Sequence, residues 1–303
     1  MREETKNKVL KLKKEKNAVI LAHFYAPSEV QEVADYVGDS FYLAKIAKDC
    51  KEDIIVFCGV AFMGESAKIL NPDKKVLMPD PSADCAMAHM VKEGKIAELR
   101  KKYPDLAVVC YINSTKELKA LSDVCVTSSN AVKIVKSLPN KNVFFIPDKN
   151  LGAFVAKQVP EKNVIINDGY CPVHVKISDL ELEELKKQHE NALILSHPEC
   201  EAVVLEKSDF VGSTADIIKY ATKSTLNEFI ICTEDGVEFK LKSDNPSKKF
   251  YFTKTRPCCM DMKQNTLEKL LHCLETEENE IKIEQEMLLK ALAPLDKMLE
   301  LAK

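Results

Sequence analysis

Polar and reactive side chains recur along this sequence at nearly equal intervals. Asp35, Asp123 and Asp209 lie in three similar segments, 34–40, 122–128 and 208–214, and are separated by 88 and then 86 residues. Imidazole, phenol, carboxylate and hydroxyl groups are the side chains that enzymes use to move protons. A shared register indicates copies of one structural unit that could share one site. The same two offsets, applied without a gap, relate three further trios: His23, Tyr111 and His197; Tyr25, Asn113 and Glu199; and Ser40, Ser128 and Thr214.

Three cysteines follow the same repeat. The chain has eleven cysteines, an odd number, and the cytosol keeps thiols reduced, so disulfides do not account for them. Cys85, Cys171 and Cys259 each follow the last expected strand of a repeat, in a loop with turn-forming neighbours, where functional residues concentrate. Advancing Cys85 by both offsets gives Cys259 rather than Cys258, and a middle loop two residues shorter accounts for Cys171. The repeat therefore predicts one thiolate per unit, all at one edge.

Three convergent thiolates could hold a metal centre. Structural zinc usually shows paired C-x2-C spacing, which is absent from this sequence. Iron–sulfur clusters also select thiolates and usually take four of them, so a cluster with three cysteine ligands would leave one iron open to act as a Lewis acid. Isolated loop cysteines are commonly ordinary residues, so the spacing alone does not decide for a cluster.

The elements that position these residues read as an α/β protein. Apolar runs at 19–22, 107–110 and 192–196 precede the residues of the first two trios, those of His23 and Tyr25, and predict buried strands. In the first unit we expect strands near 18–23, 35–37, 53–58 and 75–79, with helices beginning near Glu29, Ser40 and Ala61, and 107–166 and 192–253 repeat that order. Ser40, Ser128 and Thr214 are expected to cap helix N-termini. Alternating strands and helices predict parallel sheets whose carboxyl ends bind ligands.

Three such units divide the chain. We expect homologous Rossmann-like, three-layer α/β domains at 1–85, 86–171 and 172–259, with short parallel sheets related by a pseudo-threefold axis. In the tail, 260–303, Asn265 or Thr266 can cap a helix that runs through Cys273, and 281–283 can form a short extended piece. A final helix with an apolar stripe should bend or restart at Pro294. This tail is expected to pack back on the first domain, and an oligomer interface is the alternative.

Composition limits the partners and the compartment. With 303 residues, 46% of them hydrophobic, the chain can bury more than one core. A formal net charge of −3 gives no electrostatic reason to expect nucleic acid or an anionic membrane as a partner. The N-terminal segment lacks the apolar core of a signal peptide, and no run of about eighteen uncharged apolar residues occurs. We therefore expect a cytoplasmic protein.

Ten short motifs are distributed over almost the whole chain, and their combination in this order is highly specific for one protein family. They are residues 23–25, 34–40, 63–72, 111–114, 127–131, 147–152, 171–174, 197–200, 212–214 and 259–263. In these segments the sequence resembles the quinolinate synthase (quinolinate synthetase A) family. Some relatives carry a C-x-x-C pair around the third cysteine, proposed as a redox switch. Here Pro257, Cys258 and Cys259 lack that spacing, so the switch is not carried over.

The resemblance implies a fold, a cofactor and a reaction. It implies three α/β domains around one 4Fe-4S cluster held by Cys85, Cys171 and Cys259. It also implies a transferase of de novo NAD biosynthesis that condenses iminoaspartate with dihydroxyacetone phosphate, releasing quinolinate, phosphate and two waters. The partners are then these small molecules, with a possible functional link to the enzyme that produces iminoaspartate, and neither nucleic acid nor a membrane is expected.

The chemistry assigns roles to the polar residues. Tyr25 and Glu199 are the candidate acid and base, and Tyr111 and His197 are counted with them as catalytic. Thr214 and Ser213 are favoured for the phosphate, because helix N-termini bind anions. The other substrate-binding candidates, with His174 placed in the cavity by analogy, are His23, Ser40, Tyr111, Asn113, Ser128, His174, His197 and Glu199.

Other interpretations remain open. Taken singly, each histidine, tyrosine or hydroxyl of this set would commonly be an ordinary structural residue, and only their joint register favours a site. An iron–sulfur carrier without substrate chemistry would need four ligands and no cavity. A cluster-free sugar-phosphate lyase or aldolase would be colourless when purified without air.

Overall fold

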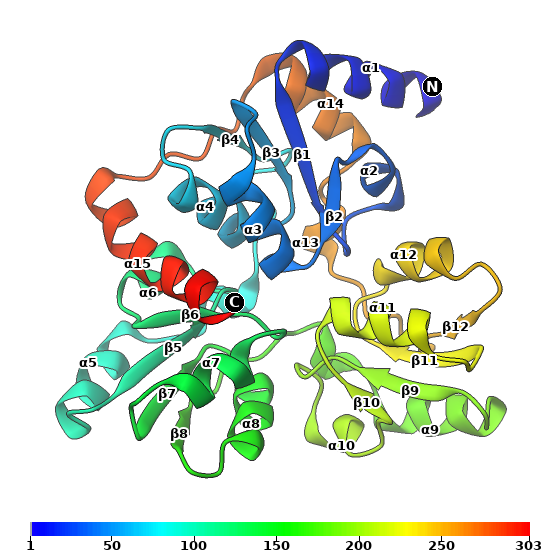
Figure 1. Cartoon of the computed structure of the whole chain (residues 1–303). Helices are drawn as coiled ribbons and strands as arrows, with labels where there is room; N and C mark the ends of the chain where they lie inside the picture. The colour runs from blue at the N-terminus through cyan, green and yellow to red at the C-terminus, as the bar shows by residue number, and fades with distance from the viewer. Residues whose placement is uncertain (1) are drawn as a thin grey trace.

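The computed structural model describes residues 2–303, which form three four-stranded sheets that appear as three lobes in Figure 1. Every strand pairing within these sheets is parallel, which confirms the predicted α/β class. The strand orders are equivalent: β2(Tyr36–Gly38), β1(Ala18–His23), β3(Ile54–Cys58), β4(Lys75–Leu77); β6(Val124–Val126), β5(Ala107–Tyr111), β7(Asn142–Ile146), β8(Asn163–Ile166); and β10(Phe210–Val211), β9(Leu193–Ser196), β11(Glu228–Cys232), β12(Lys249–Tyr251).

Helices alternate with these strands. The first lobe contains α1(Arg2–Glu15), α2(Ser28–Val33), α3(Ser40–Asp49) and α4(Ala61–Leu70). The second contains η1(Ala86–His89), α5(Glu93–Lys102), α6(Lys116–Ala120), α7(Ala131–Ser137) and α8(Lys149–Gln158). The third contains η2(His174–Lys176), α9(Asp179–Gln188), α10(Ala202–Leu205), α11(Thr214–Lys223) and α12(Val237–Asp244), and the chain ends with α13(Met260–Lys263), α14(Leu267–Thr276) and α15(Gln285–Leu301). Each sheet thus draws its strands from one of the expected repeats; the domain boundaries and the pseudo-threefold axis stay predictions.

The central strands are buried because their sequences are apolar throughout. All residues of β1, β3 and β5 are buried, as expected for parallel strands covered on both faces. The predicted strand 18–23 coincides with β1, and the helices expected near Glu29, Ser40 and Ala61 begin within one residue of those positions. Periodicity was sufficient here because the hydrophobic pattern and the turn residues agree.

The repeated aspartates have one structural role. Asp35, Asp123 and Asp209 each accept, through Oδ2, the backbone N–H of the residue fifteen positions earlier in the central strand, at 2.9, 2.7 and 2.8 Å. Those donors are the backbone nitrogens of Ile20, Val108 and Ile194. Because each aspartate immediately precedes an edge strand, its carboxylate fixes that strand against β1, β5 or β9. The aspartate that recurs in the sequence therefore makes the same hydrogen bond in all three sheets.

The helix caps lie one residue before some of the predicted positions. Asp39 caps α3 by accepting from the backbone of Tyr42 at 2.9 Å, and Ser213 caps α11 within a capping box completed by Asp216. Ser40 and Thr214 are the first helical residues, so the prediction that they are caps was wrong. An N-cap side chain must turn back toward its own helix. The following residue is then free to present its hydroxyl elsewhere.

The tail covers two lobes. α14 packs against α1 and α2 of the first lobe, and its N-cap is Thr266. α15 contacts α6, β6 and α7 as well as α4, which differs from the expectation that the whole tail lies on the first domain (Figure 1). Three residues of its buried stripe, Ala291, Leu295 and Met298, close a core shared by the first two lobes. α15 continues through Pro294 without restarting.

Candidate active site and metal centre

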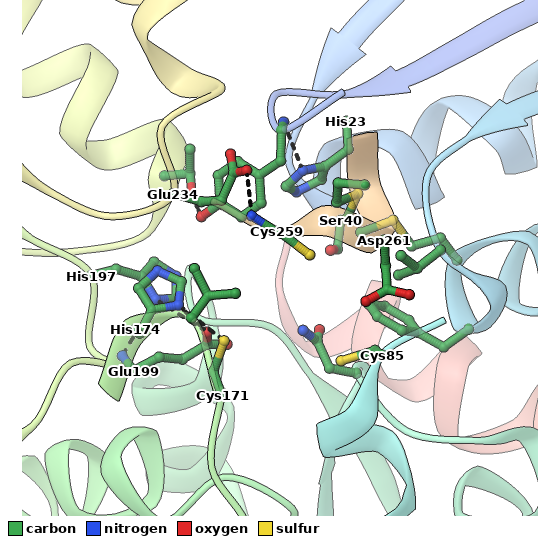
Figure 2. Close-up of a pocket in the computed structure, with 18 of the residues that line it drawn as sticks. His23, Ser40, Cys85, Cys171, His174, His197, Glu199, Glu234, Cys259 and Asp261 are labelled. Atoms are coloured by element: carbon green, nitrogen blue, oxygen red, sulfur yellow. Dashed lines mark hydrogen bonds and ion pairs between the residues drawn. The ribbon is translucent and has the colours of Figure 1, made fainter. Parts of the chain in front are cut away.

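One cavity gathers the predicted residues from all three lobes. It lies at the carboxyl ends of the sheets, where His23 and Tyr111 end β1 and β5 and His197 follows β9. All nine residues of the three trios line it, together with His174. Ser213 does not line it. Figure 2 shows labelled side chains from all three lobes pointing into the same space.

The three loop cysteines line this cavity as well. The sulfurs of Cys85, Cys171 and Cys259 face one central space in Figure 2, whereas Cys258 is not among the lining residues. They do not form a group whose ligand atoms all lie within 4.8 Å, as the ligands of a single ion would. A soft donor set of three separated thiols around one space fits a polynuclear iron–sulfur cluster better than a mononuclear zinc ion.

Carboxylates hold the backbone of each cysteine loop. Asp148 Oδ2 accepts the N–H of Cys171 at 3.1 Å, and Asp84 Oδ1 accepts that of Cys85 at 2.7 Å. Glu234 lies two residues after β11, just as Asp148 lies two residues after β7. Its carboxylate accepts the backbone N–H of Cys259 in the third loop. These three carboxylates are not among the site residues that the sequence pattern predicts. The signal was present, because Asp148 and Glu234 are separated by the repeat offset of 86 residues.

Burial makes the thiols of this cavity poor acids on their own. It raises the pKa of Cys259 to about 11 and raises the pKa values of Cys85 and Cys171 above the ordinary range, with nearby Glu199 adding to the effect for both. A metal centre favours the thiolate form and would compensate this desolvation.

A buried carboxylate lies between two imidazoles. Glu199 Oε2 is 2.8 Å from Nδ1 of His174 and 3.9 Å from Nδ1 of His197. Burial alone would raise the pKa of Glu199, but the neighbouring His174 and His197 and a hydrogen bond from Tyr111 outweigh it and lower this pKa to about 2. Burial lowers the pKa of His197 to about 3, and that of His23 likewise to about 3. The site therefore combines the ionised carboxylate of Glu199 with the neutral imidazoles of His23 and His197.

The first and third lobes meet at Tyr25. Its hydroxyl lies 2.7 Å from Thr214 Oγ1 and 2.8 Å from Thr233 Oγ1. Thr233 also lies 2.9 Å from Nε2 of His174. Burial raises the pKa of Tyr25 well above its ordinary value, so the phenol stays protonated near neutral pH. Thr233 was not singled out from the sequence, where it is simply the residue after an apolar strand.

The second lobe contributes hydrogen-bonding groups with free capacity. Ser128 Oγ lies 3.2 Å from Nε2 of His197, and burial raises the pKa of Tyr111 so that this phenol is neutral too. The amide oxygen of Asn113 is buried without a protein hydrogen-bond partner. A buried polar atom without a partner is costly, so its presence in a cavity indicates a ligand that satisfies it.

Within the part of the chain that the structure describes, two groups of residues have ligand atoms close enough for a single ion. Cys171, His174 and Glu199 form one of them, inside the cavity. Glu234, Asp235 and Cys258 form the other, but the ammonium of Lys263 already lies 2.7 Å from Glu234 and 3.3 Å from Asp235. Only the first therefore belongs to the candidate centre.

Comparison with known sequences identifies the group of proteins to which this arrangement belongs. Residues 7–300 match the model of the family described as quinolinate synthetase A protein. The chain belongs to the quinolinate synthetase A family. Among its relatives, the quinolinate synthase of Clostridioides difficile is 54% identical over 97% of both chains. Those of Caldicellulosiruptor bescii and Fusobacterium nucleatum are 53% and 54% identical over at least 98% of each chain.

All residues that line the cavity lie within the part of the chain that matches the family model. The match to the quinolinate synthetase A family spans all three sheets, so the repeats and the tail helices belong to the matched region. Among residues 2–303, no helix is both long enough and apolar enough to span a bilayer.

Proposed function

We propose that this protein is a quinolinate synthase of de novo NAD biosynthesis. In this reaction iminoaspartate and dihydroxyacetone phosphate condense to quinolinate with release of one phosphate and two waters. The carbon skeletons join, the imine nitrogen closes the ring and the eliminations make it aromatic. The names of the relatives, which cover nearly the whole chain, support this assignment.

One observation carries the proposal. Each of the three repeats brings a cysteine and at least three polar groups at equivalent positions to the same cavity. A carrier of electrons has no use for such a cavity, and a cluster-free aldolase has no use for three cysteines around it. A metal-assisted condensation of two small polar substrates uses both.

Cys85, Cys171 and Cys259 would hold a 4Fe-4S cluster, each from a loop whose backbone is fixed by a carboxylate. When bound, a cluster with one iron free of protein ligands supplies a Lewis acid that polarises a substrate nitrogen or oxygen. The remaining roles belong to the side chains of the cavity.

Anionic substrates must be bound here without lysine or arginine, because neither lines the cavity among residues 2–303. Hydrogen bonds from His23, His197 and Ser128 suit the carboxylates of iminoaspartate. The unpartnered amide oxygen of Asn113 suits an N–H or O–H donor on a substrate. These neutral groups give orientation without fixed positive charge.

The phosphate site is proposed at the N-termini of α3 and α11, where free backbone N–H groups favour an anion. Ser40 and Thr214 are their first residues, and both line the cavity. Ser213 does not suit this role. Its hydroxyl donates to Asp216 at 2.7 Å and its backbone N–H donates to the same oxygen at 3.1 Å.

Proton transfers are assigned to one donor and one acceptor that both line the cavity. The neutral phenol of Tyr25 can donate and the ionised carboxylate of Glu199 can accept. Tyr111 and His197 adjoin Glu199 and complete the set that surrounds the reacting atoms. Because an imine hydrolyses in water, we also propose a functional link to the oxidising enzyme that makes iminoaspartate.

Anaerobic purification with iron and sulfide assays tests this function. Wild type should contain four irons per chain and form quinolinate from iminoaspartate and dihydroxyacetone phosphate. Cys171→Ala and Cys259→Ala should lose both properties. Cys258→Ala is the matched control, because Cys258 adjoins Cys259 in sequence but does not line the cavity, and it should keep both. A wild-type protein that forms quinolinate without iron would refute the proposal.

A further inference from the structure

Thr233 connects Tyr25, a candidate catalytic residue, with His174, a candidate substrate-binding residue, without lining the cavity itself. We propose that Thr233 is a positioning residue that fixes the direction of the Tyr25 hydroxyl. This inference rests on the proposed function, in which Tyr25 takes part in proton transfer, and it assigns a role to a residue of the third lobe that acts only through a residue of the first.

The Thr233 hydroxyl has two polar neighbours and no exposure to solvent. Its side chain is fully buried, and Oγ1 lies 2.8 Å from the Tyr25 hydroxyl and 2.9 Å from Nε2 of His174. Both separations are ordinary hydrogen-bond lengths. A hydroxyl carries one proton, so it can donate to only one of these two neighbours and must accept from the other.

The Thr233 hydroxyl is itself held in place. Nε2 of His174, in the same lobe, lies 2.9 Å from Oγ1, and the Tyr25 hydroxyl lies 2.8 Å from the same oxygen. Thr233 is therefore a fixed hydrogen-bond partner for the phenol, whichever of the two hydroxyls donates.

The consequence lies at Tyr25. Thr233 and Thr214 contact the phenol oxygen at 2.8 and 2.7 Å, so these two hydroxyls together limit how the O–H group can face the cavity. Without Thr233 the phenol keeps only the contact to Thr214 and can rotate about its C–O bond. Thr233 thus restricts the orientation of a group that faces the substrate.

Other contacts hold the main chain of Tyr25 independently of Thr233. Lys263 Nζ donates to the backbone oxygen of Tyr25 at 2.8 Å. A Cβ placed on Gly236 would lie only 2.7 Å from the Cα of Tyr25, so the two backbones are in close contact. Removal of the Thr233 hydroxyl should therefore leave Tyr25 in place and release only the orientation of its O–H group.

The repeat offers no equivalent elsewhere. Residues offset from Thr233 by 86 and then 88 positions are Pro147 and Gly59, neither of which has a hydroxyl. The positions equivalent to Tyr25 in the other two repeats are Asn113 and Glu199, so the tyrosine also occurs in one repeat alone. The tyrosine and the threonine occur as a pair only where the first and third lobes meet.

Thr233→Val and Thr233→Ser, made in the cluster-loaded enzyme, test the role. Thr233→Val keeps the shape of the side chain and loses the hydroxyl. We expect kcat to fall about 10–100-fold, as when a reacting group is misoriented, while KM changes less than about threefold and iron content stays at the wild-type value. Thr233→Ser should restore most of kcat. A Thr233→Val enzyme with wild-type kcat, or one that loses its iron, overturns the inference.

A double-mutant cycle with Tyr25→Phe separates positioning from a general structural effect. If Thr233 acts through the phenol, Thr233→Val in the Tyr25→Phe background should change kcat by less than about twofold. Multiplying effects would contradict the proposal. A wild-type enzyme that forms no quinolinate would refute the proposed function instead. Failure of the proposed function and failure of the Thr233 inference are therefore distinguishable.

Discussion

The carboxylate of Glu234 lies 2.9 Å from the backbone nitrogen of Cys259 and accepts its N–H. The same carboxylate accepts from the backbone of Gly236 at 2.7 Å and pairs with Lys263. It is fully buried, so the Cys259 loop is attached to the end of β11 through a charge that water does not screen. Asp148 and Cys171 repeat the arrangement at the end of β7. The backbones of the Cys171 and Cys259 loops are therefore held by buried acidic residues.

Glu234→Gln should weaken the metal centre while Cys259 remains in place. An amide presents a donor where the carboxylate accepts from both backbone nitrogens and Lys263, so one of these bonds must be lost. Supporting residues of this kind commonly contribute tenfold or more to metal affinity, and we expect iron loss to a chelator to be about tenfold faster. Glu228→Gln, at the opposite end of β11, is the control. Equal rates in both variants would exclude this role.

Asn113→Ala should change activity and stability in different directions. The buried amide oxygen of Asn113 has no protein partner, so its removal costs no hydrogen bond through that atom, while a substrate contact is lost. We expect an unchanged or higher melting temperature and at least about tenfold lower kcat/KM for quinolinate formation. In Asn245→Ala, which removes bonds to Leu241 and Thr222, the melting temperature should fall with activity kept. A loss of stability in Asn113→Ala would argue for a structural role instead.

The sequence identified the strands and the cavity residues, but not the residues that act across the repeats. His23, Tyr111 and His197 could be located because buried apolar strands are readable from pattern and all three occupy the carboxyl ends. Thr233 could not, because its importance arises from Tyr25, 208 positions earlier in the chain. No local pattern records such a contact.

Ser213 shows a second limit. A serine before a helix can cap that helix or bind an anion, and its residue type does not distinguish the two. Asp216 three residues later, which completes the capping box, was the local signal that favoured capping. The apolar stripe of α15 was likewise readable, but whether it faces α4, α6 or another copy depends on tertiary packing.

Asp209→Ala should destabilise the third lobe. Its Oδ2 accepts the N–H of Ile194 at 2.8 Å, and alanine leaves that donor at the start of β9 without its partner. We expect a loss of about 1–3 kcal/mol in the free energy of unfolding, measured by denaturant titration. Asp168→Ala, at an exposed loop position, should stay within about 0.5 kcal/mol of wild type. Equal stabilities of these two variants would contradict a structural role for the repeated aspartate.

Glu277 should make stability depend on pH in the acid range. It follows α14 with a left-handed backbone and pairs with Lys16 at 2.6 Å and Lys75 at 2.5 Å. Hydrogen bonds to these two lysines lower the pKa of Glu277 to about 2 from 4.5. A carboxylate whose pKa is depressed on folding stabilises the native state above pH 4.5, and that stabilisation is lost as the pH falls from 4.5 toward 2.

The variant Glu277→Gln isolates this contribution. Because about a quarter of the Glu277 side chain is exposed and water screens its ion pairs, they are worth no more than about 1 kcal/mol, so the variant should melt about 1–3 °C below wild type at pH 7. The difference should shrink as the pH is lowered from 5 toward 3, since the wild-type carboxylate then begins to take up its proton. Added salt should also reduce it at pH 7. A difference that stays constant between pH 7 and pH 3 would show that the glutamate acts through its backbone conformation and not through its charge.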